Sequence, residues 1–270
     1  MLTSFFEMLN YDFIVNALIA GLLISVCASL IGTNLVLKKQ SMIGDGLSHV
    51  AFGAMIIAIT FGFAPLYFTI PVVIIASYLI LRINNSRNIN NDAAIAILSS
   101  SALAIGAIVN TLNPGKNIDI NSYLFGSILA INHSDLIVIA ITTIIVSLLY
   151  LIFYKQIFAI TIDEKFAKSI GINTRLYSAI LAAICSVVIV LGMRMLGALL
   201  ISSLIIFPCI SARYLTKSFR NTVITSVALA IISFLFGLTA SYTFNLPSGA
   251  SIVCANLICF IICWVYNKLR

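Results

Sequence analysis

The chain has 270 residues, of which 61% are hydrophobic and only 9% are charged. A soluble domain does not need so much apolar surface, so the composition excludes that class and indicates a protein that crosses a membrane several times. The formal net charge of +7 does not indicate a nucleic-acid-binding protein, because the basic residues are spread over the connections between apolar segments.

Apolar segments follow one another along the whole chain. Nine of them are long enough to cross a hydrocarbon core of about 30 Å, some with the help of flanking residues. We therefore expect an all-α, polytopic integral membrane protein that forms one domain over residues 1–270, with about nine transmembrane helices and a range of eight to ten. In chain order the expected spans are Phe13–Leu37, Gly44–Phe63, Leu66–Leu81, Asp92–Leu112, Ser134–Tyr154, Leu176–Met193, Leu196–Tyr214, Thr222–Ser241 and Ser248–Tyr266.

The basic residues indicate how these spans are oriented. With the N-terminus outside and the C-terminus in the cytoplasm, all of the 15 Lys and Arg residues fall on the cytoplasmic side except Lys116 and Arg194. Cytoplasmic loops of membrane proteins carry an excess of Lys and Arg, so this topology is favoured. The charge therefore reports orientation in a lipid bilayer, and we expect no nucleic-acid partner.

A carboxylate and an imidazole lie near the start of the second span, in Gly44-Asp45-Gly46-Leu47-Ser48-His49. In a helix, Asp45 and His49 lie on one face, about one turn apart. A charged group within a membrane costs at least about 2.5–3.5 kcal/mol, so it usually faces an interior pathway or a partner. Oxygen and nitrogen donors suit a divalent transition metal. The pair is therefore either a metal-binding site or a structural contact between helices.

Three other polar residues lie at the ends of spans. Asp92 begins the fourth span, where the helix N-terminus favours a carboxylate with or without a metal. His133 precedes the fifth span and is either a surface residue or a ligand at an entrance. Arg194, between the sixth and seventh spans, is expected to play a structural role, by reaching backbone carbonyls or by extending outward.

The connection between the fifth and sixth spans is expected to contain a short cytoplasmic helix within residues 161–172. Thr161 can cap its N-terminus, Asp163 and Glu164 suit the positive end of its dipole, and Gly171 can end it. A solvated surface connector is the simpler alternative for this segment.

A second long connection, between the fourth and fifth spans, contains the amphipathic stretch Tyr123–Leu129. This stretch predicts a short helix that either lies at the membrane interface or enters the membrane. The chain contains no G-x-x-x-x-G-K-[ST], H-E-x-x-H or G-x-S-x-G pattern. We therefore do not expect an enzyme, and any ATP hydrolysis must come from another chain.

Five segments, in this order along nearly the whole chain, resemble motifs of the zinc/manganese ABC-importer permeases, the ABC-3 family. Gly44–His49 is similar to the family's G-D-A-L-S-H segment, Tyr123–Leu129 to S-Y-L-F-G-D-I-L, and Asp163–Gly171 to its D-E-x-x-A-x-x-x-G coupling loop. Gly192–Leu200 resembles its G-x-R-x-x-G-x-L-L run, and Leu246–Ala250 its final outer turn.

The resemblance implies the membrane subunit of an ATP-binding-cassette importer in a bacterial cytoplasmic membrane. Such a permease forms a homodimer, receives its ion from an extracytoplasmic metal-binding lipoprotein, and docks two copies of a cytoplasmic ATP-hydrolysing subunit. By position, the ATPase-coupling helix would contain Asp163, Glu164, Phe166, Ala167 and Gly171.

The resemblance also implies that a zinc or manganese ion is transported and that no cofactor is bound permanently. Asp45 and His49 would contact the ion in transit, with Asp92 as a weaker candidate. Imidazole suits zinc and carboxylate suits manganese, and zinc is slightly favoured because few hard oxygen ligands lie nearby in the sequence. The sequence departs from the family where Phe52-Gly53 lacks a frequent proline and Ser127 replaces a frequent acidic residue.

Two other functions are compatible with the residues. One is a permease of the same architecture for a chelated metal, such as a siderophore or haem, which would tolerate loss of Asp45. The other is an ATP-independent metal transporter, which would work without an ATPase partner and for which the short cytoplasmic helix would be dispensable.

Overall fold

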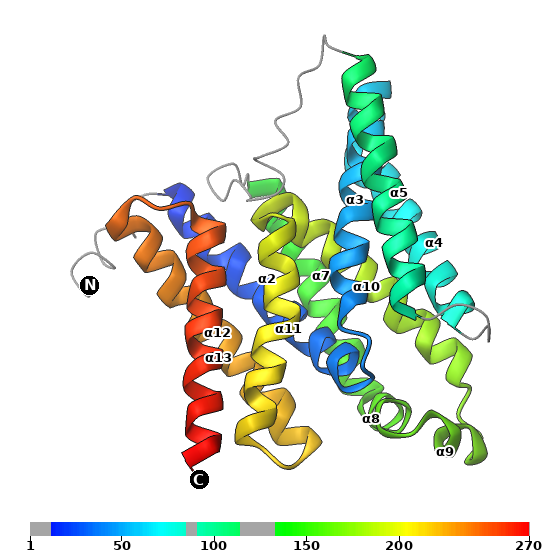
Figure 1. The fold of residues 1–270 in the computed structure, drawn as a ribbon, viewed down its shortest axis with the longest axis vertical. Helices are drawn as coiled ribbons and strands as arrows, with labels where there is room; N and C mark the ends of the chain where they lie inside the picture. Colours follow the sequence, from blue (N-terminus) through cyan, green and yellow to red (C-terminus); the bar gives the residue numbers. More distant parts are fainter. Residues whose placement is uncertain (1–11, 85–90, 114–132, 270) are drawn as a thin grey trace.

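The computed structural model describes residues 12–84, 91–113 and 133–269, and in these residues every regular element is a helix (Figure 1). The amphipathic stretch at residues 123–129 lies outside the described residues. The helices are α2 (Asp12–Leu37), α3 (Met42–Phe61), α4 (Pro65–Asn84), α5 (Asn91–Leu112), α7 (His133–Ile152), α8 (Tyr154–Ile162), α9 (Glu164–Ser169), α10 (Thr174–Leu196), α11 (Ala198–Leu215), α12 (Phe219–Phe244) and α13 (Ser248–Leu269).

Nine of the helices in the described ranges are long and apolar enough to cross a membrane. They are α2 to α5, α7 and α10 to α13, and their bounds agree with the expected spans within a few residues. The prediction of an all-helical polytopic membrane protein with about nine spans is therefore confirmed. Helix α3 is also continuous after His49 through Phe52 and Gly53, in agreement with the absence of the proline that is frequent there in the family.

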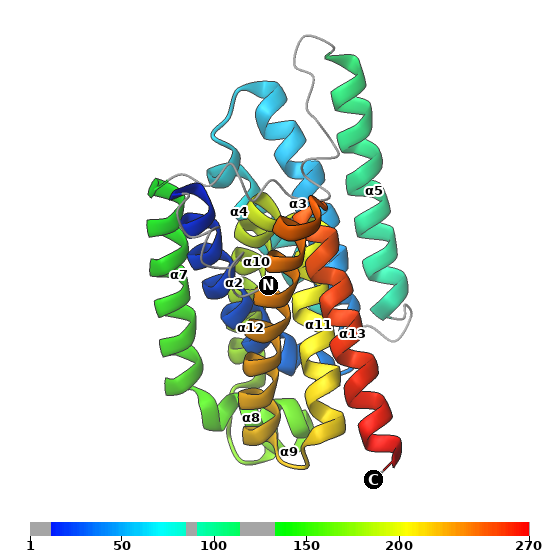
Figure 2. The ribbon, with the colours of Figure 1, turned by 90° about the vertical axis from the view of Figure 1, so that its left-hand side faces the viewer.

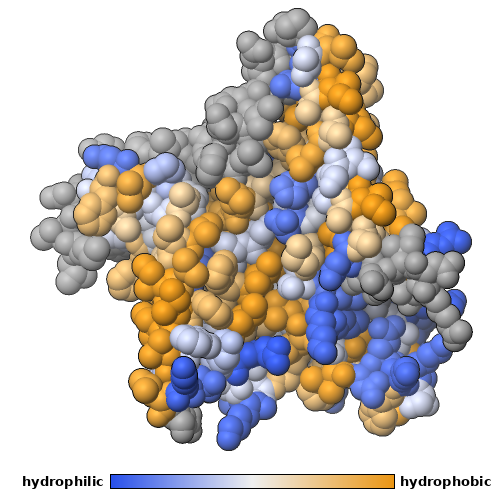
Figure 3. Space-filling view, in the orientation of Figure 1, coloured by the Kyte–Doolittle hydropathy of each residue, from blue (hydrophilic) through white to orange (hydrophobic). Residues whose placement is uncertain are grey.

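The two short helices α8 and α9 lie at one end of the bundle, together with the C-terminal end of α13 (Figures 1 and 2). We call this the charged end, because Lys38, Glu164, Arg175, Lys217 and Lys268 belong to the helix ends and connections there. In the space-filling view, hydrophilic residues gather along the lower edge, whereas apolar residues cover much of the surface above it (Figure 3). This separation suits a molecule whose middle is surrounded by lipid.

Helix α3 packs against α4, α5, α10 and α11 and lies parallel to α5. Its Gly53 faces the backbone of Ala102, and a Cβ atom at Gly53 would collide with the Ala102 carbonyl oxygen. The opposing Gly106 is also close to α3, since a Cβ there would lie 2.9 Å from Gly53 Cα. Small residues allow transmembrane helices to approach this closely, and the contact fixes α3 beside α5.

A single residue, Gly197, joins α10 to α11. Its φ of 92° and ψ of 157° lie in a region that is essentially restricted to glycine, so the chain reverses there without an intervening loop. The reversal places Gly192 on α10 against Ile201 on α11. The two helices therefore form a tight hairpin, and its second arm reaches α3.

The structure corrects the expected start of the short helix at the charged end. Thr161 does not cap it, because Thr161 belongs to the last turn of α8. The N-cap is Asp163, whose carboxylate accepts hydrogen bonds from the backbone N–H groups of Lys165 (2.9 Å) and Phe166 (3.1 Å). The expected end is correct, since α9 stops just before Gly171, which has a φ of 86°.

Candidate functional site

Asp45 and His49 lie on one face of α3, as predicted from their spacing. Asp45 Oδ2 is 3.6 Å from His49 Nε2, and the two side chains are 40% and 26% exposed, respectively. The carboxylate belongs to the first turn of α3, where the positive end of the helix dipole favours it. A partly exposed carboxylate and an imidazole are thus held together near the start of an apolar helix.

Neighbouring groups hold this turn of α3 in place. Ser48 is buried, and its hydroxyl donates a 2.7 Å hydrogen bond to the backbone carbonyl of Asp45. On the adjacent face, Gly44 packs against the side chain of Ile205 on α11. The backbone that carries Asp45 therefore lies against α11.

Ser202 on α11 adds a third polar group to the site. Its hydroxyl donates a 3.1 Å hydrogen bond to the backbone carbonyl of Ala198 and lies near the Asp45 carboxylate. The sequence did not predict Ser202 as a site residue, because its position beside Asp45 depends on how α11 packs against α3. A serine within an apolar span is also common at plain helix contacts, so the sequence carried no separate signal.

The two nitrogens of His49 have different surroundings. Nε2 faces Asp45, whereas Nδ1 is buried and has no hydrogen-bond partner among the described residues. A buried polar atom without a partner costs about 1–3 kcal/mol, so such an atom often marks a functional position. One nitrogen of His49 is therefore left without a polar partner within the described parts of the chain.

The pair is an incomplete metal site by itself. No group of three or more His, Cys, Asp or Glu side chains that could hold a metal ion is found in the described parts of the chain. A tightly bound structural zinc ion usually has four protein ligands. Two donors and a nearby hydroxyl suit an ion that is bound weakly and released again.

Asp92 does not join the pair. It lies in the first turn of α5 and is exposed, and it does not form a three-residue ligand group with Asp45 and His49. The next turn of α5 nevertheless lies against α3, since Ile95 contacts Gly46. Asp92 is thus on a neighbouring helix at the same end of α3.

The two other polar residues at span ends, His133 and Arg194, differ in their surroundings. His133 is the first residue of α7 and is exposed. For Arg194 we expected a structural role, and its Nη1 atom lies 3.4 Å from Oδ1 of Asp135, in an ion pair between α10 and α7. The sequence did not predict this partner, because nothing local relates the last turn of α10 to the first turn of α7.

Helix α9 presents an apolar surface away from the bundle. Ala167 is fully buried against the protein, whereas Phe166 is 59% exposed, and Ile162 and Ile170 on either side of it are 62% and 55% exposed. Three large exposed apolar side chains thus lie on α9 and at its two ends, at the charged end of the molecule. We call Ile162, Phe166 and Ile170 the α9 ridge. An exposed apolar surface of this kind is typical of a protein contact.

These features together define a multi-span helical membrane protein with a half-exposed carboxylate–imidazole pair and a short helix at its charged end, an arrangement typical of transport proteins. A model of the ABC 3 transport family matches residues 10–267. The chain therefore belongs to the ABC 3 transport family, and members of this family are the permease subunits of ATP-binding-cassette importers, in which a separate subunit hydrolyses ATP.

Individual relatives agree with this assignment. The manganese import system permease protein ScaB of Streptococcus gordonii is 30% identical over 97% of this chain and 94% of its own length. The high-affinity zinc uptake system membrane protein ZnuB of Haemophilus influenzae is 27% identical over 93% of this chain and 97% of its own length. Among solved structures, PsaBC from Streptococcus pneumoniae in complex with Fab matches with a TM-score of 0.87 and 29% identity, over 98% of this chain and 95% of the matched chain.

Proposed function

We propose that this permease moves zinc or manganese ions through the cytoplasmic membrane into a bacterial cell, and that Asp45 and His49 contact the ion in transit. The observation that carries the proposal is the 3.6 Å contact between a carboxylate and an imidazole within a membrane-spanning helix. Both donor types bind divalent transition metals, and relatives named for manganese import and for zinc uptake both match nearly the whole chain.

The exposure of Asp45 supports a position on the ion's path. A carboxylate that is 40% exposed on a membrane-spanning helix would face lipid if nothing else covered it, at a cost of at least about 2.5–3.5 kcal/mol. A water-filled vestibule next to α3, closed on the far side by a second copy of the chain, removes that cost. We therefore place the path at the interface of a homodimer.

The ATP-hydrolysing subunits dock at the charged end in this proposal. The α9 ridge supplies exposed apolar surface there, and the basic residues around it favour a cytoplasmic location for this end. The N-terminus is then outside the cell and the C-terminus is in the cytoplasm. Asp163 and Gly171 define the two ends of the docking helix, and Glu164 lies at its start.

An extracytoplasmic binding lipoprotein delivers the ion at the opposite end. The ion enters an outward-open vestibule and meets Asp45 and His49, with Asp92 as a secondary contact near the base of α5. ATP-driven closure of the two cytoplasmic subunits moves α9 and changes the side from which the site is accessible. Weak, incomplete coordination by two donors per chain allows the ion to leave.

Uptake of radioactive zinc and manganese tests this function and names the metal. The cells should lack their own importers for both metals and should express the permease with its ATP-hydrolysing and binding subunits. We expect accumulation of at least one ion that depends on this permease and on ATP. Accumulation of neither free ion, or accumulation only of a chelated metal, would overturn the proposal.

A further inference from the structure

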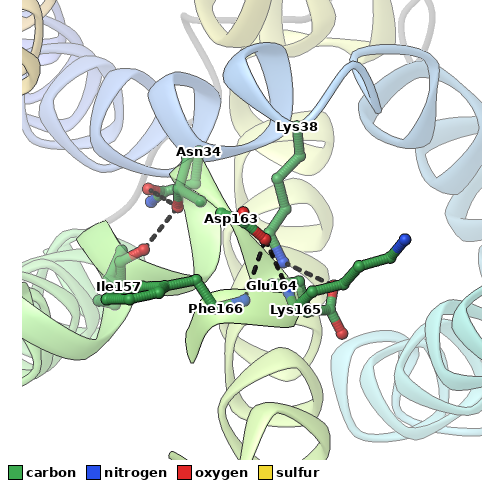
Figure 4. Close-up of polar contacts among 8 residues, drawn as sticks. Asn34, Lys38, Ile157, Asp163, Glu164, Lys165 and Phe166 are labelled. Carbon is green, nitrogen blue, oxygen red and sulfur yellow. Dashed lines mark hydrogen bonds and ion pairs between the residues drawn. The ribbon is translucent and has the colours of Figure 1, made fainter. Parts of the chain in front are cut away.

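Two polar contacts join the end of α2 to the region where α8 meets α9 (Figure 4). The Thr161 hydroxyl lies 3.2 Å from Asn34 Oδ1 and 2.6 Å from the Ile157 carbonyl oxygen, so it donates one hydrogen to these two acceptors. One turn further along the chain, just past the end of α2, Lys38 Nζ lies 3.8 Å from Glu164 Oε2. The contacts therefore occur on both sides of the bend between α8 and α9.

The two contacts differ in burial. Asn34 and Thr161 are 3% and 6% exposed, so their hydrogen bond is shielded from water and is specific in geometry. The side chain of Lys38 is only 15% exposed, whereas that of Glu164 is 56% exposed. Burial lowers the pKa of Lys38, and the Glu164 carboxylate opposes that effect. Glu164 is thus the nearby negative charge that stabilises the buried ammonium group.

The connection between α2 and α3 is short and internally hydrogen-bonded. Lys39 has a φ of 58°, and the N–H groups of Lys39 and Gln40 donate to the carbonyls of Val36 and Leu35 at 3.0 and 2.8 Å. This pattern is a Schellman motif, which ends α2 and gives carbonyl groups of its last turn hydrogen-bond donors. The N–H of Ile43 then donates to the Gln40 carbonyl and begins α3. A displacement of the end of α2 is therefore passed on to the start of α3.

We propose that Asn34, Lys38, Thr161 and Glu164 form a mechanical link that transmits movement of α9, through the end of α2, to the turn of α3 that carries Asp45. Two contacts one helical turn apart fix the direction of α9 relative to α2 as well as its position. The link rests on the proposed docking of ATP-hydrolysing subunits at α9. It assigns to these four residues a positioning role, and none of them touches the transported ion.

Charge exchange tests the ion pair. Lys38→Glu and Glu164→Lys each place two like charges together, whereas the double variant restores an opposite pair with the positions reversed. At matched abundance in the reconstituted complex, we expect each single variant to lower the metal transported per ATP hydrolysed at least fivefold, and the double variant to recover at least half of the unsubstituted value. Lys217→Glu makes the same charge change on an exposed residue at the charged end and should have little effect.

The buried contact is tested by Thr161→Val, which removes the hydroxyl and keeps the branched shape, with Thr161→Ser as the variant that retains it. We expect the valine variant to lose transport per ATP hydrolysed and the serine variant to keep most of it. Equal ratios in the unsubstituted, valine and charge-reversed complexes would overturn the link. Loss of the ATP-hydrolysing subunit from the single variants, without recovery in the double charge-exchange variant, would also overturn the link. Glu164 would then act only in docking.

Hydrogen exchange separates this proposal from the proposed transport function. Addition of ATP to the reconstituted complex should change amide exchange in the peptide covering residues 38–47, and the change should fall at least twofold in Lys38→Glu and return in the double variant. No ATP-dependent change in the unsubstituted complex, or the same change in the single variants, would overturn the link. If this pattern of hydrogen exchange is observed but neither zinc nor manganese is transported, the proposed transport function is refuted and the link is still supported.

Discussion

Arg194 and Asp135 form an ion pair of 3.4 Å that joins the last turn of α10 to the first turn of α7. The two side chains are buried to different extents, since Arg194 is 35% exposed and Asp135 only 13%. If Arg194 is removed, the unpaired charge that remains is the more deeply buried carboxylate of Asp135. If Asp135 is removed, the unpaired charge is the more exposed guanidinium of Arg194.

We expect Arg194→Gln to destabilise the protein by about 1–2 kcal/mol and Asp135→Asn by less. The cost of breaking a partly buried ion pair should lie between the costs for an exposed pair and for a fully buried pair. Thermal unfolding of the purified protein in detergent measures the effect, at about 2–4 °C for each kcal/mol. The double variant should lose less than the sum of the two single changes. The control is Asp12→Asn, at an exposed carboxylate in the first turn of α2. Equal unfolding temperatures for Arg194→Gln and this control would contradict the prediction.

The contact of α3 with α5 predicts that Gly53→Ala is strongly destabilising. The added Cβ meets the backbone carbonyl of Ala102, which cannot move without displacing α5. Overpacking of this kind costs about 1–3 kcal/mol. Gly44→Ala in the same helix is the matched control, because its Cβ would lie 3.2 Å from the mobile Cδ1 end of Ile205. Similar thermal stability of the two variants would show that α3 and α5 are not in close backbone contact.

The N-cap of α9 predicts a local effect of substitution at Asp163. Asp163→Ala removes the acceptor for two backbone N–H groups at a cost of about 1 kcal/mol, whereas Asp163→Asn keeps an acceptor. Amide hydrogen exchange in residues 164–170 should be several-fold faster in the alanine variant than in the asparagine variant. Identical exchange in the two variants would mean that the cap does not stabilise α9.

The α9 ridge predicts a change in subunit association without a change in folding. Phe166→Ala should weaken retention of the ATP-hydrolysing subunit by roughly tenfold, as expected when a central apolar anchor of an interface is truncated. Its thermal stability should be unchanged, because the ring is 59% exposed in the isolated chain. Ile144→Ala, at a 63% exposed residue of α7, is the matched control and should not affect retention. Normal retention with Phe166→Ala would place the docking surface elsewhere.

The nine spans found in the described residues and the shared face of Asp45 and His49 could be predicted because both follow from local periodicity. An apolar run of about 20 residues in lipid must satisfy its own backbone, and it does so as a helix. A separation of four residues then places two side chains on one face. Neither inference requires knowledge of which helices are neighbours in space.

The contacts that complete the site could not be predicted because they join distant helices. Ser202 lies near Asp45, and Arg194 pairs with Asp135, only because α11 packs on α3 and α10 lies near α7. The incorrect prediction of Thr161 as the N-cap of α9 has a similar cause. Thr161 and Asp163 can both cap a helix, and the choice of Asp163 leaves the Thr161 hydroxyl beside Asn34 on α2, a contact that the local sequence does not reveal.

The central claim is that Asp45 and His49 contact the transported ion. Its most direct measurement is uptake of radioactive zinc and manganese in metal-starved cells that express the whole importer, with Asp45→Asn and His49→Gln at the same membrane abundance as the unsubstituted permease. Asp12→Asn controls for the loss of a carboxylate elsewhere. We predict that each site variant lowers uptake at least tenfold and that the control has no effect. Uptake at the unsubstituted level in both site variants would contradict the claim and make the pair a structural contact.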